Sequence, residues 1–533
     1  MNTANPKSSC LPRLGRLAAC VTFALATADT TAQSLVAAPL PTALTSTRTL
    51  RHGLKQLKVS GQSFAATGNT LAVTSCADNE AVGTLRSEIF LAADGDTVDL
   101  SQLSCSTITL ANGAFTIGAN RSLRIIASPS NPITIDAHGA SRVIDLTITD
   151  DQLYLQNLKL TNGYFRNDDP NSTAQGGCID FRGFVTLKST LVSGCKVVNS
   201  SGPVRGGAIV VSMLNMYDSE VTGSVATGLN ARGGGIYSQG GDAYLRDSTV
   251  SGNQALSSAS VISGYAQGGG MDTFVSNIKI VRSTVVGNIA QANVGVASGG
   301  GIFSHYGNHV DVAFSTISGN RAVSPASSGG GMRTRFAANI TYSTLEHNQS
   351  VNNSALVIAG SAQIRNSTIS GNTATTGSST IYARISMAVD HSTIAFNVAK
   401  GTSAGIYLYA DATVDLESTI IANNTSTSGG GFDLVSHTTV TGAYNLVRNP
   451  ASALPANVAT MGVDPLLAPL ANNGGPTKTH ALQTGSPAID AGKNPQFLPY
   501  DQRGPGFGRV VGAASDIGAY ESDPDRIFTN GFE

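Results

Sequence analysis

A short phrase of alternating polar and apolar residues recurs along the chain between residues 157 and 424. Its nine copies read TLVSGC, SEVTGS, STVSGN, STVVGN, STISGN, STLEHN, STISGN, STIAFN and STIIAN, and they begin 24 to 35 residues apart. The third position is apolar in each copy: Val192, Val221, Val250, Val285, Ile317, Leu345, Ile369, Ile394 and Ile420. Because alternation with period two places successive side chains on opposite faces of a strand, each copy predicts a short strand with one buried face.

Glycine runs precede most of these copies, from Gly176–Ile179 to Gly329–Met332, and a later run spans Gly429–Phe432. Glycine permits positive φ and close backbone approach, so these runs predict corners that lead into strands. One turn then holds a glycine corner, a strand, a second strand with the phrase, and another corner. About ten such turns, stacked at the roughly 4.8 Å spacing of paired strands, form a rod of roughly 50 Å.

The predicted fold class is all-β, a right-handed parallel β-helix (a pectate-lyase-like solenoid), with the hand taken from the crossover rule. A helical repeat would lose its packing register where the spacing of the copies changes. We therefore expect the extra residues of the longer repeats to lie in loops.

Seven of the nine copies end in asparagine, and stacked turns would superpose these residues as an internal ladder. Each amide would bond the next along the axis and satisfy backbone groups that a corner would otherwise bury unpaired. Asparagine also tolerates the left-handed backbone of a tight corner. The predicted ladder consists of Asn253, Asn288, Asn320, Asn348, Asn372, Asn397 and Asn423. Cys195 and Ser224 occupy the same position in the first two copies.

Both ends of a β-helix expose strand edges and apolar core, so both are expected to be covered. Residues Thr84 to Ala93 have apolar side chains at helical spacing after a threonine cap, which predicts a short N-terminal capping helix. A C-terminal cap is expected at the other end. Strand-like runs follow the helix at Thr97–Leu100, Thr107–Leu110, Ala114–Ile117, Leu123–Ile126, Ile133–Asp136 and Val143–Ile148.

The N-terminus carries basic residues, then the apolar stretch Leu17 to Ala28 and small residues up to Ala32. This order predicts a secretory signal peptide over residues 1–32, followed by a flexible linker over 33–70. A lipoprotein signal ending at Cys20 is the alternative, but the apolar stretch between Arg16 and Cys20 is too short for it.

Removal of the leader leaves four cysteines, an even number that favours two disulfides in an exported protein. Proximity in sequence suggests Cys76 with Cys105 and Cys178 with Cys195, although four cysteines allow three pairings. A metal site is the alternative, but no histidine-rich spacing accompanies these cysteines.

Only 13% of the residues are charged and the formal net charge is −1. This balance does not predict a nucleic-acid partner. We expect a monomer that is secreted or held at a bacterial cell surface, including an association with the outer membrane, and that has no transmembrane segment once the leader is removed.

Residues Cys76 to Leu110 resemble the CSLREA-type N-terminal region of bacterial surface β-helix proteins, with Leu85-Arg86 and Glu88-Ile89 at the positions of LREAI. The match departs from that pattern at Gly83-Thr84 and at the inserted Ser87.

The C-terminal part resembles the choice-of-anchor Q region over residues 446–521. Four phrases carry this likeness in order: Asn472–Thr477, Gly485–Gly492, Asp501–Gly504 and Asp516–Glu521. These resemblances imply a secreted or surface β-helix protein. The tail over 522–533 ends in Ile527–Glu533, which is similar to a short sorting signal of exported bacterial proteins.

A polysaccharide lyase or glycoside hydrolase is the alternative function, because such enzymes occur on this fold. Hydrolysis needs two opposed carboxylates, and elimination needs a base with charge-neutralising groups, which are often Ca²⁺. Asp168-Asp169 occurs beside a proline and fits a solvated turn. The other acids are scattered: Asp180, Asp272, Asp311, Asp390, Asp411, Asp415 and Asp433. No catalytic, cofactor or metal residues are predicted.

A second group of polar residues is placed to line one face over adjacent turns: His305, His309, Arg333, Arg335, Arg384 and His391. Ordinary surface and loop contacts are the favoured interpretation of these residues. The charged residues of the C-terminal region predict buried ion pairs rather than a Ca²⁺ site: Asp490, Asp501, Arg503, Arg509, Asp516 and Glu521.

The sequence thus predicts an N-terminal cap with the first turns of the solenoid over residues 71–150 and the β-helix repeats over residues 151–445. The predicted function is that of an exported, non-catalytic, adhesin-like protein. Its extracellular protein or glycan ligand is expected to meet the Thr/Ser-rich outer face of the solenoid, or the loops before Ser283 and Ser315.

Overall fold

A computed structural model gives the structure of the chain. It describes residues 68–118, 121–146, 151–260, 263–307, 309–377, 379–429 and 431–523. The chain divides into two units, Met1–Gln62 and Ser63–Glu533, and all described residues lie in the second. The predicted leader and the tail from residue 524 therefore lie outside the described residues.

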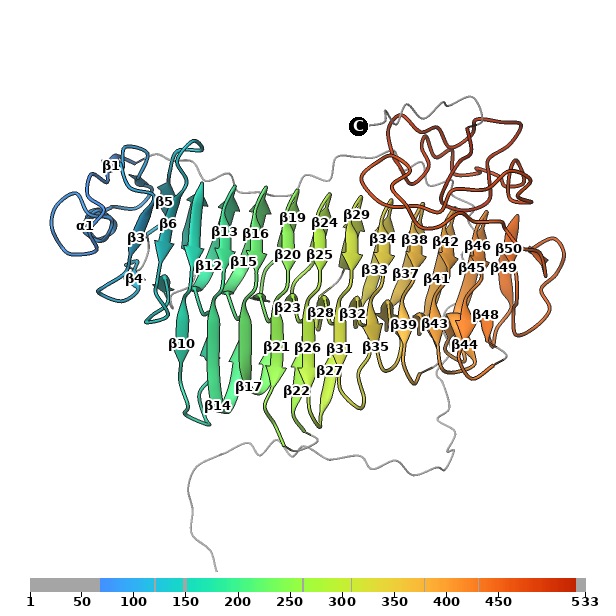
Figure 1. The fold of residues 1–533 in the computed structure, drawn as a ribbon, viewed down its shortest axis with the longest axis horizontal. Coiled ribbons are helices and arrows are strands. Elements are labelled where there is room, and N and C mark those ends of the chain that lie inside the picture. The colour runs from blue at the N-terminus through green and yellow to red at the C-terminus, as the bar shows by residue number, and fades with distance from the viewer. Residues whose placement is uncertain are drawn as a thin grey trace, which may run out of the picture. The chain divides into compact units, whose positions relative to one another are not determined.

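The second unit is a parallel β-helix of about thirteen turns, so the all-β solenoid prediction is confirmed (Figure 1). Every strand pairing between its named strands is parallel, and each turn contributes strands to three long sheets. The estimate of ten turns was low because residues 97–161 already wind as full turns, with β3, β6 and β9 in successive rungs.

Sheet 1 holds two strands from most turns. Its strands are β1 Thr70–Ala72, β2 Thr97–Asp99, β4 Phe115–Thr116, β5 Leu123–Ile126, β7 Ile144–Leu146, β8 Gln152–Gln156, β12 Ile179–Lys188, β15 Ile209–Tyr217, β18 Ile236–Gln239, β19 Ala243–Arg246, β23 Met271–Phe274, β24 Ile278–Val281, β28 Ile302–Ser304, β29 His309–Ala313, β32 Met332–Thr334, β33 Ala337–Thr341, β36 Leu356–Ile358, β37 Ser361–Arg365, β40 Ile381–Ala383, β41 Ser386–Asp390, β44 Ser403–Leu408, β45 Thr413–Glu417, β48 Phe432–Val435 and β49 Val440–Ala443.

Sheet 2 carries the repeated phrase. Its strands are β3 Thr107–Thr109, β6 Ile133–Asp136, β9 Leu158–Thr161, β13 Leu191–Ser193, β16 Glu220–Thr222, β20 Thr249–Ser251, β25 Thr284–Val286, β30 Thr316–Ser318, β34 Thr344–Glu346, β38 Thr368–Ser370, β42 Thr393–Ala395, β46 Ile420–Ala422, β50 Asn445–Val447 and β51 Ala459–Met461.

Sheet 3 leads from the phrase to the next glycine corner. Its strands are β10 Tyr164–Arg166, β11 Ala174–Gln175, β14 Lys196–Arg205, β17 Val225–Arg232, β21 Gln254–Ser257, β22 Tyr265–Gln267, β26 Ile289–Ala292, β27 Val296–Ser298, β31 Arg321–Val323, β35 Gln349–Ser350, β39 Thr373–Ala374, β43 Val398–Ala399 and β47 Thr425–Ser426.

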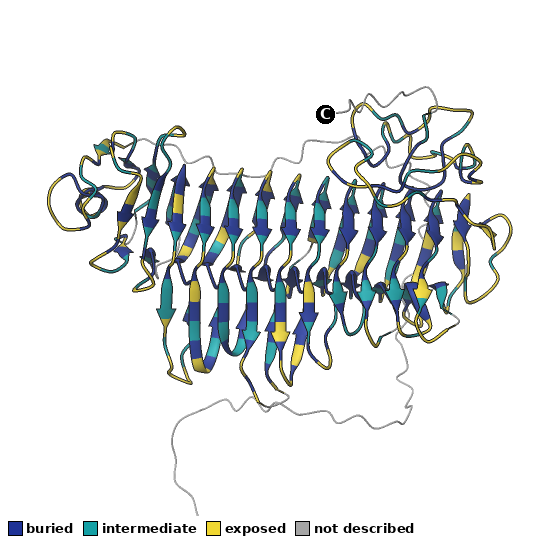
Figure 2. Cartoon of the chain, viewed as in Figure 1, coloured by how far each residue is buried: buried dark blue, intermediate teal, exposed yellow. Residues whose placement is uncertain are grey.

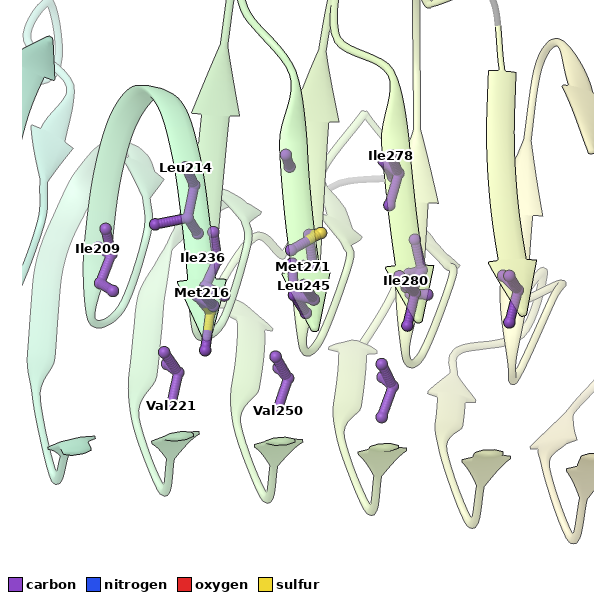
Figure 3. Close-up of a cluster of buried hydrophobic side chains, with 14 of the residues drawn as sticks. Ile209, Leu214, Met216, Val221, Ile236, Leu245, Val250, Met271, Ile278 and Ile280 are labelled. Carbon is purple, nitrogen blue, oxygen red and sulfur yellow. The ribbon is translucent and has the colours of Figure 1, made fainter. Parts of the chain in front are cut away.

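One apolar core runs along the inside of the solenoid from Val73 to Ala459. Figure 3 shows part of it, where Val221 and Val250 from the phrase face residues of sheet 1 such as Ile236 and Met271. The alternation that predicted one buried face per strand is visible in the colouring of Figure 2.

The extra residues of the longer repeats do not lie only in loops, which corrects the sequence prediction. They extend sheet 3 into a second layer, in which strands such as β22 Tyr265–Gln267 and β27 Val296–Ser298 return toward the solenoid. We call this extension the wing. It has a small core of its own that contains Val197, Val204 and several alanines, because two backbones approach closely there.

Hydrogen-bonded asparagines form a ladder along the corner between sheets 2 and 3. Asn320 shows the repeating pattern: its Oδ1 accepts from both N and Nδ2 of Asn288, at 3.0 Å each, and its own Nδ2 donates to Oδ1 of Asn348 at 3.0 Å. The same amide also donates to the Val285 carbonyl at 2.9 Å. Each ladder residue is fully buried, so these bonds replace water for backbone groups at the corner.

The last predicted member of this ladder was wrong, because Asn424 rather than Asn423 accepts from Asn397. The final copy is shifted by one residue, so that Ile421, not Ile420, enters the core. Asn423 instead has φ of 60° at the position that Gly371 occupies with φ of 67°. The left-handed corner is thus taken by the residue before each ladder asparagine, not by the asparagine itself.

A second ladder, which the sequence did not reveal, runs along the corner between sheets 1 and 2. The first residue of each phrase accepts a bond from the backbone N–H of its counterpart in the preceding turn, as between Ser283 N and Ser315 Oγ at 3.1 Å. Its members are Thr190, Ser219, Ser248, Ser283, Ser315, Ser343, Ser367, Ser392, Thr419 and Asn445.

The N-terminal end is closed by the expected helix, α1 Leu85–Leu91. Thr84 caps it by accepting from Ser87 N, and Leu85 and Ile89 are buried in the solenoid core. The predicted disulfides are confirmed: Cys76 is bonded to Cys105, and Cys178 to Cys195. The second disulfide crosses a turn at the first rung of the asparagine ladder.

The C-terminal region lies along the side of the solenoid rather than only over its end, which corrects the expected cap (Figure 1). It contacts the outer face of sheet 2 over several rungs, as the bonds of Thr344 Oγ1 to Lys478 O and of Ala519 N to Thr393 Oγ1 show. Gln502 is fully buried in this contact and bonds Thr344, Thr368 and Thr477.

Replacement of Asn320 by alanine is predicted to lower the free energy of unfolding by about 1–3 kcal/mol, because Asn288 loses its acceptor and Val285 its donor. Denaturant unfolding of the mature protein measures the change. Asn339→Ala is the control, since this partly exposed side chain bonds only Asp311 on the outer surface. Equal midpoints for the Asn320 variant and the parent would contradict the role of the ladder.

Gln502→Ala is predicted to loosen the C-terminal region, because it leaves buried hydroxyls on both sides of the contact unpaired, at a cost of about 1–3 kcal/mol. Amide exchange should accelerate over residues 465–521 and in strand β38. The exposed Gln496 provides a matched control. Unchanged exchange in Gln502→Ala would show that the contact does not depend on this side chain.

Candidate functional site

The outer face of sheet 2, which the sequence favoured for binding, is partly occupied by the chain itself. The C-terminal region covers it from β34 to β50, and Ile420, Leu446 and Ile517 form a small apolar cluster between the two. Among the described strands, the rungs from β3 to β30 keep outward side chains such as Thr222 and Ser251 clear of this cover. The Thr/Ser face is therefore much shorter than the repeat implies.

The outer face of the first strands of sheet 1 carries the greatest concentration of rings and guanidinium groups. Side chains alternate between the two faces of each strand, which explains this arrangement. Ile302, Met332 and Ile381 point into the core, and the residue after each of them points outward. We call this surface, together with the arginines that end the adjoining strands β14 and β17 of sheet 3, the arginine–aromatic strip: Arg205, Arg232, Tyr237, Asp272, Phe274, Phe303, His305, Tyr306, Arg333, Arg335, Phe336, Tyr382, Arg384, Tyr407 and Tyr409.

Aromatic side chains follow one another along the strip. Phe274 and Tyr306 meet edge to face with centroids 5.1 Å apart, and Tyr306 lies 6.5 Å from Phe336. Further along, Tyr382 and Tyr407 are paired in the strand register and stack with centroids 6.1 Å apart and planes 7° apart. Tyr306 and Phe336 are 46% and 38% exposed, so part of this ring system is open to solvent.

Arginines lie over these rings. Arg335 lies 5.8 Å from the centroid of Tyr306, and Arg384 lies 5.6 Å from that of Tyr409. Arg333 projects outward from β32 and lies 5.9 Å from the Phe303 ring. Burial, followed by the charge of Arg335, lowers the pKa of Arg333. Two cationic groups are therefore held close together on this part of the strip.

A buried ion pair between Arg232 and Asp272 lies within the strip. Nε and Nη2 of Arg232 each lie 3.0 Å from a carboxylate oxygen of Asp272, and His305 Nε2 lies 3.6 Å from the same carboxylate. Burial alone would raise the pKa of Asp272, but Arg232 and His305 outweigh it and hold the pKa below its usual value. Burial lowers the pKa of His305. Asp272 is 0% exposed, so its carboxylate cannot touch a polymer on the surface.

A cavity of about 410 Å³ lies near the N-terminal end of the strip. Arg142 lines it, bonds Asp145 and Asp180 at 2.9 and 3.4 Å, and lies 3.4 Å from the Phe165 centroid. The guanidinium there is already neutralised by two carboxylates.

Of the other acids noted in the sequence, Asp390 and Asp415 lie on neighbouring rungs beside Glu417, whose pKa is raised to about 7 by burial and then by these two carboxylates. Asp390 pairs with Arg365 at 2.8 Å, and Asp433 ends the asparagine ladder by accepting from Asn424. Burial raises the pKa of Asp433 to about 6. Asp311 and Asp415 lie on the outer face of the second strands of sheet 1, where they accept from Asn339 and Thr441.

The remaining acids of the alternative function occupy turns. Asp168 is exposed and bonds Ser200 and Arg166, which lower its pKa to about 2, and Asp169 bonds Asn171 and Ser172 beside it. Asp411 is exposed in a turn after Tyr409.

Four of the six His and Arg residues singled out in the sequence share the strip: His305, Arg333, Arg335 and Arg384. The other two do not. His309 begins β29 and is exposed, whereas His391 is buried at the corner of sheets 1 and 2 and bonds the Lys493 carbonyl. Burial lowers the pKa of His391 to about 3, so this imidazole is neutral and structural.

The charged residues of the C-terminal region form buried ion pairs. Arg503 lies 2.6 Å from Asp501, and Arg509 lies 2.9 Å from Glu521. Within the residues that the structure describes, His, Cys, Asp and Glu side chains do not gather in groups of three that could hold a metal ion. In the same part of the chain, no helix is long and apolar enough to span a membrane.

The aromatic members of the strip escaped the sequence reasoning because they follow the glycine corners at different offsets. Tyr237 and Phe303 come four residues after the first glycine of their runs, whereas Tyr306 and Phe336 come seven. A signal was present, since rings recur after successive glycine corners, but only the strand register shows that they form one surface.

No family model matches the chain, and no curated protein matches it. Among solved structures, the chain is similar to the crystal structure of pectate lyase Pel9A, with a TM-score of 0.39 and 12% identity over 86% of this chain and 97% of that chain. Similarity at this level carries no argument about activity. The resemblances to the CSLREA-type and choice-of-anchor Q regions remain predictions.

Asp272→Ala is predicted to cost about 3–5 kcal/mol of unfolding free energy, because it leaves the buried Arg232 guanidinium without a counter-charge. The double variant Arg232→Met/Asp272→Leu should regain most of this loss, since it removes both charges together. Denaturant unfolding of the three proteins gives the comparison. A single variant as stable as the parent would show that the pair does not support the strip.

Proposed function

We propose that the protein is an exported, non-catalytic β-helix that binds an extracellular glycan through the arginine–aromatic strip. The observation that carries this proposal is the pair of stacked rings, Tyr382 and Tyr407, on neighbouring rungs of an outward face. Flat aromatic faces pack against the apolar faces of sugar rings, and hydrogen-bond donors at their edges fix orientation. Arg335 and Arg384 supply such donors beside Tyr306 and Tyr409.

The rung spacing supports an extended ligand. Neighbouring rungs are roughly 4.8 Å apart, so the exposed part of the strip, from Tyr306 after β28 to Tyr409 after β44, offers side chains on successive rungs. A polymer with a short chemical repeat makes the same contact at several of them. A compact ligand would use only a fraction of this surface.

The burial of the acids favours binding over catalysis. Asp180, Asp272, Asp390 and Asp433 are each at most 5% exposed and already have partners. A general acid or base must reach a proton of the bound substrate. The four carboxylates are occupied in stabilising the fold instead.

Export is proposed from three observations. The N-terminal pattern is typical of a signal peptide, two disulfides are present, and the two resemblances belong to secreted or surface proteins. Retention at the cell surface through the C-terminal tail is part of the same proposal.

The double variant Tyr382→Ala/Tyr407→Ala is predicted to weaken glycan binding at least tenfold, since stacking of one ring contributes on the order of 1 kcal/mol and two are removed. A glycan array with the mature protein identifies the ligand, and calorimetry measures the affinities. Tyr217→Ala/Tyr244→Ala is the matched control, because this pair, with centroids 5.7 Å apart, lies elsewhere on sheet 1.

Equal losses in both double variants would refute the strip as the binding face. Release of reducing ends or unsaturated sugars from any bound polysaccharide would show that the protein is an enzyme, and the non-catalytic proposal would then fail.

A further inference from the structure

We infer that the glycan is anionic, and that its carboxylate or sulfate groups are bound by Arg333, Arg335 and Arg384. This inference rests on the proposed binding function and names the chemistry of its ligand. It is carried by the distribution of charge along the strip.

The arginines of the strip differ in whether an acid neutralises them. Arg232 pairs with Asp272, whereas Arg205 donates to the neutral side chain of Gln239. From β32 onward, the described residues include no acid in an ion pair with Arg333, Arg335 or Arg384. The part of the strip from β32 to β40 is therefore positively charged.

Arg333 shows the imbalance most clearly. Its Nη1 donates to Ser298 Oγ at 3.0 Å and to Ser328 Oγ at 2.8 Å, which fixes the guanidinium in place with neutral partners. The side chain is only partly exposed, and a partly buried cation without a counter-charge destabilises the fold that holds it. An anion bound at this point would remove that cost. The remaining guanidinium N–H groups are able to donate to its oxygens.

The spacing of the exposed arginines fits a repeating anion. In the strand register, Met332, Leu356 and Ile381 occupy equivalent positions on successive rungs. Arg335 and Arg384 each follow three residues later, two rungs and thus roughly 10 Å apart. A polymer that bears one acidic group in each short repeat unit would meet both arginines along the axis.

The only carboxylate within the strip does not oppose such a ligand. Asp272 is 0% exposed and is held by Arg232 and His305, so its charge is compensated inside the protein. The exposed rings of Tyr306, Phe336 and Tyr409 lie beside the cations, on the same rung or on the next one, and would contact the sugar rings.

The test compares hyaluronan, which carries carboxylates, with its methyl ester, which has the same sugar chain without these charges. Heparin supplies a sulfated probe and dextran a neutral one. The mature full-length protein is expected to bind hyaluronan or heparin at least tenfold more tightly than the methyl ester or dextran. This preference should decrease as the salt concentration is raised from about 0.05 M to about 0.5 M, because salt screens the attraction between the arginines and the anionic groups.

The variant Arg335→Gln/Arg384→Gln removes two exposed cations and keeps hydrogen-bonding capacity. It is predicted to lose at least tenfold in affinity for the anionic probe and little for a neutral one, because each charged hydrogen bond is worth about a factor of ten or more. Arg321→Gln/Lys400→Gln removes the same charge from exposed positions outside the strip and should bind like the parent.

The outcomes separate the inference from the function on which it rests. The protein could bind hyaluronan and its methyl ester equally well and lose both affinities in Tyr382→Ala/Tyr407→Ala. That result would overturn the inference that the ligand is anionic, but it would support the strip as the glycan-binding face. Parental affinity of Arg335→Gln/Arg384→Gln would also overturn it. Failure to bind any of the four probes or any glycan on the array would overturn both.

Discussion

The two ladders of buried polar side chains are the constraint on which the rest of the structure depends. A strand that turns sharply inside a solenoid leaves backbone groups that water cannot reach. Asn320 and its counterparts satisfy these groups at one corner, and Ser315 and its counterparts at the other. Since each ladder residue bonds the next turn, the register of all three sheets is fixed at two points in each repeat.

That fixed register is what makes an outward surface possible. The wing and the changing repeat lengths lie between the ladders, so they vary without shifting the strands above and below. Tyr382 and Tyr407 stack because Ile381 and Ile406 are paired in the core beneath them. The alignment of Arg335 with Arg384 has the same origin. The inner positions are occupied by the core and the ladders. Side chains that bind a ligand must therefore lie at outward positions.

The C-terminal region changes which outward positions remain. Gln502 and the threonines of β34 and β38 form a polar contact that covers the later rungs of sheet 2. The sequence could not show this, because residues more than 130 apart meet there. It did predict that the charged residues of this region form buried ion pairs, although not which residues pair, as Arg503–Asp501 and Arg509–Glu521 do.

Periodicity explains both the success and the errors of the sequence reasoning. The strands, the core positions from Val192 to Ile394 and six of the seven ladder asparagines repeat with the phrase, and short-range pattern was enough to find them. Asn423 was misplaced because the last copy begins at Thr419, one residue later than its Ser-Thr pair suggests, which only strand pairing reveals. The serine ladder was missed because serine at a strand start has many ordinary explanations. The aromatic rings vary in offset, so their common surface depends on three-dimensional register.

Hydrogen exchange of the mature protein with and without its bound glycan tests the central claim most directly. Peptides that contain β28, β32, β40 and β44 should become protected, while those of sheet 2 from β9 to β30 should exchange as in the free protein. Protection that falls on sheet 2, or at the open end near β49 and β51, would contradict the assignment of the arginine–aromatic strip as the binding face.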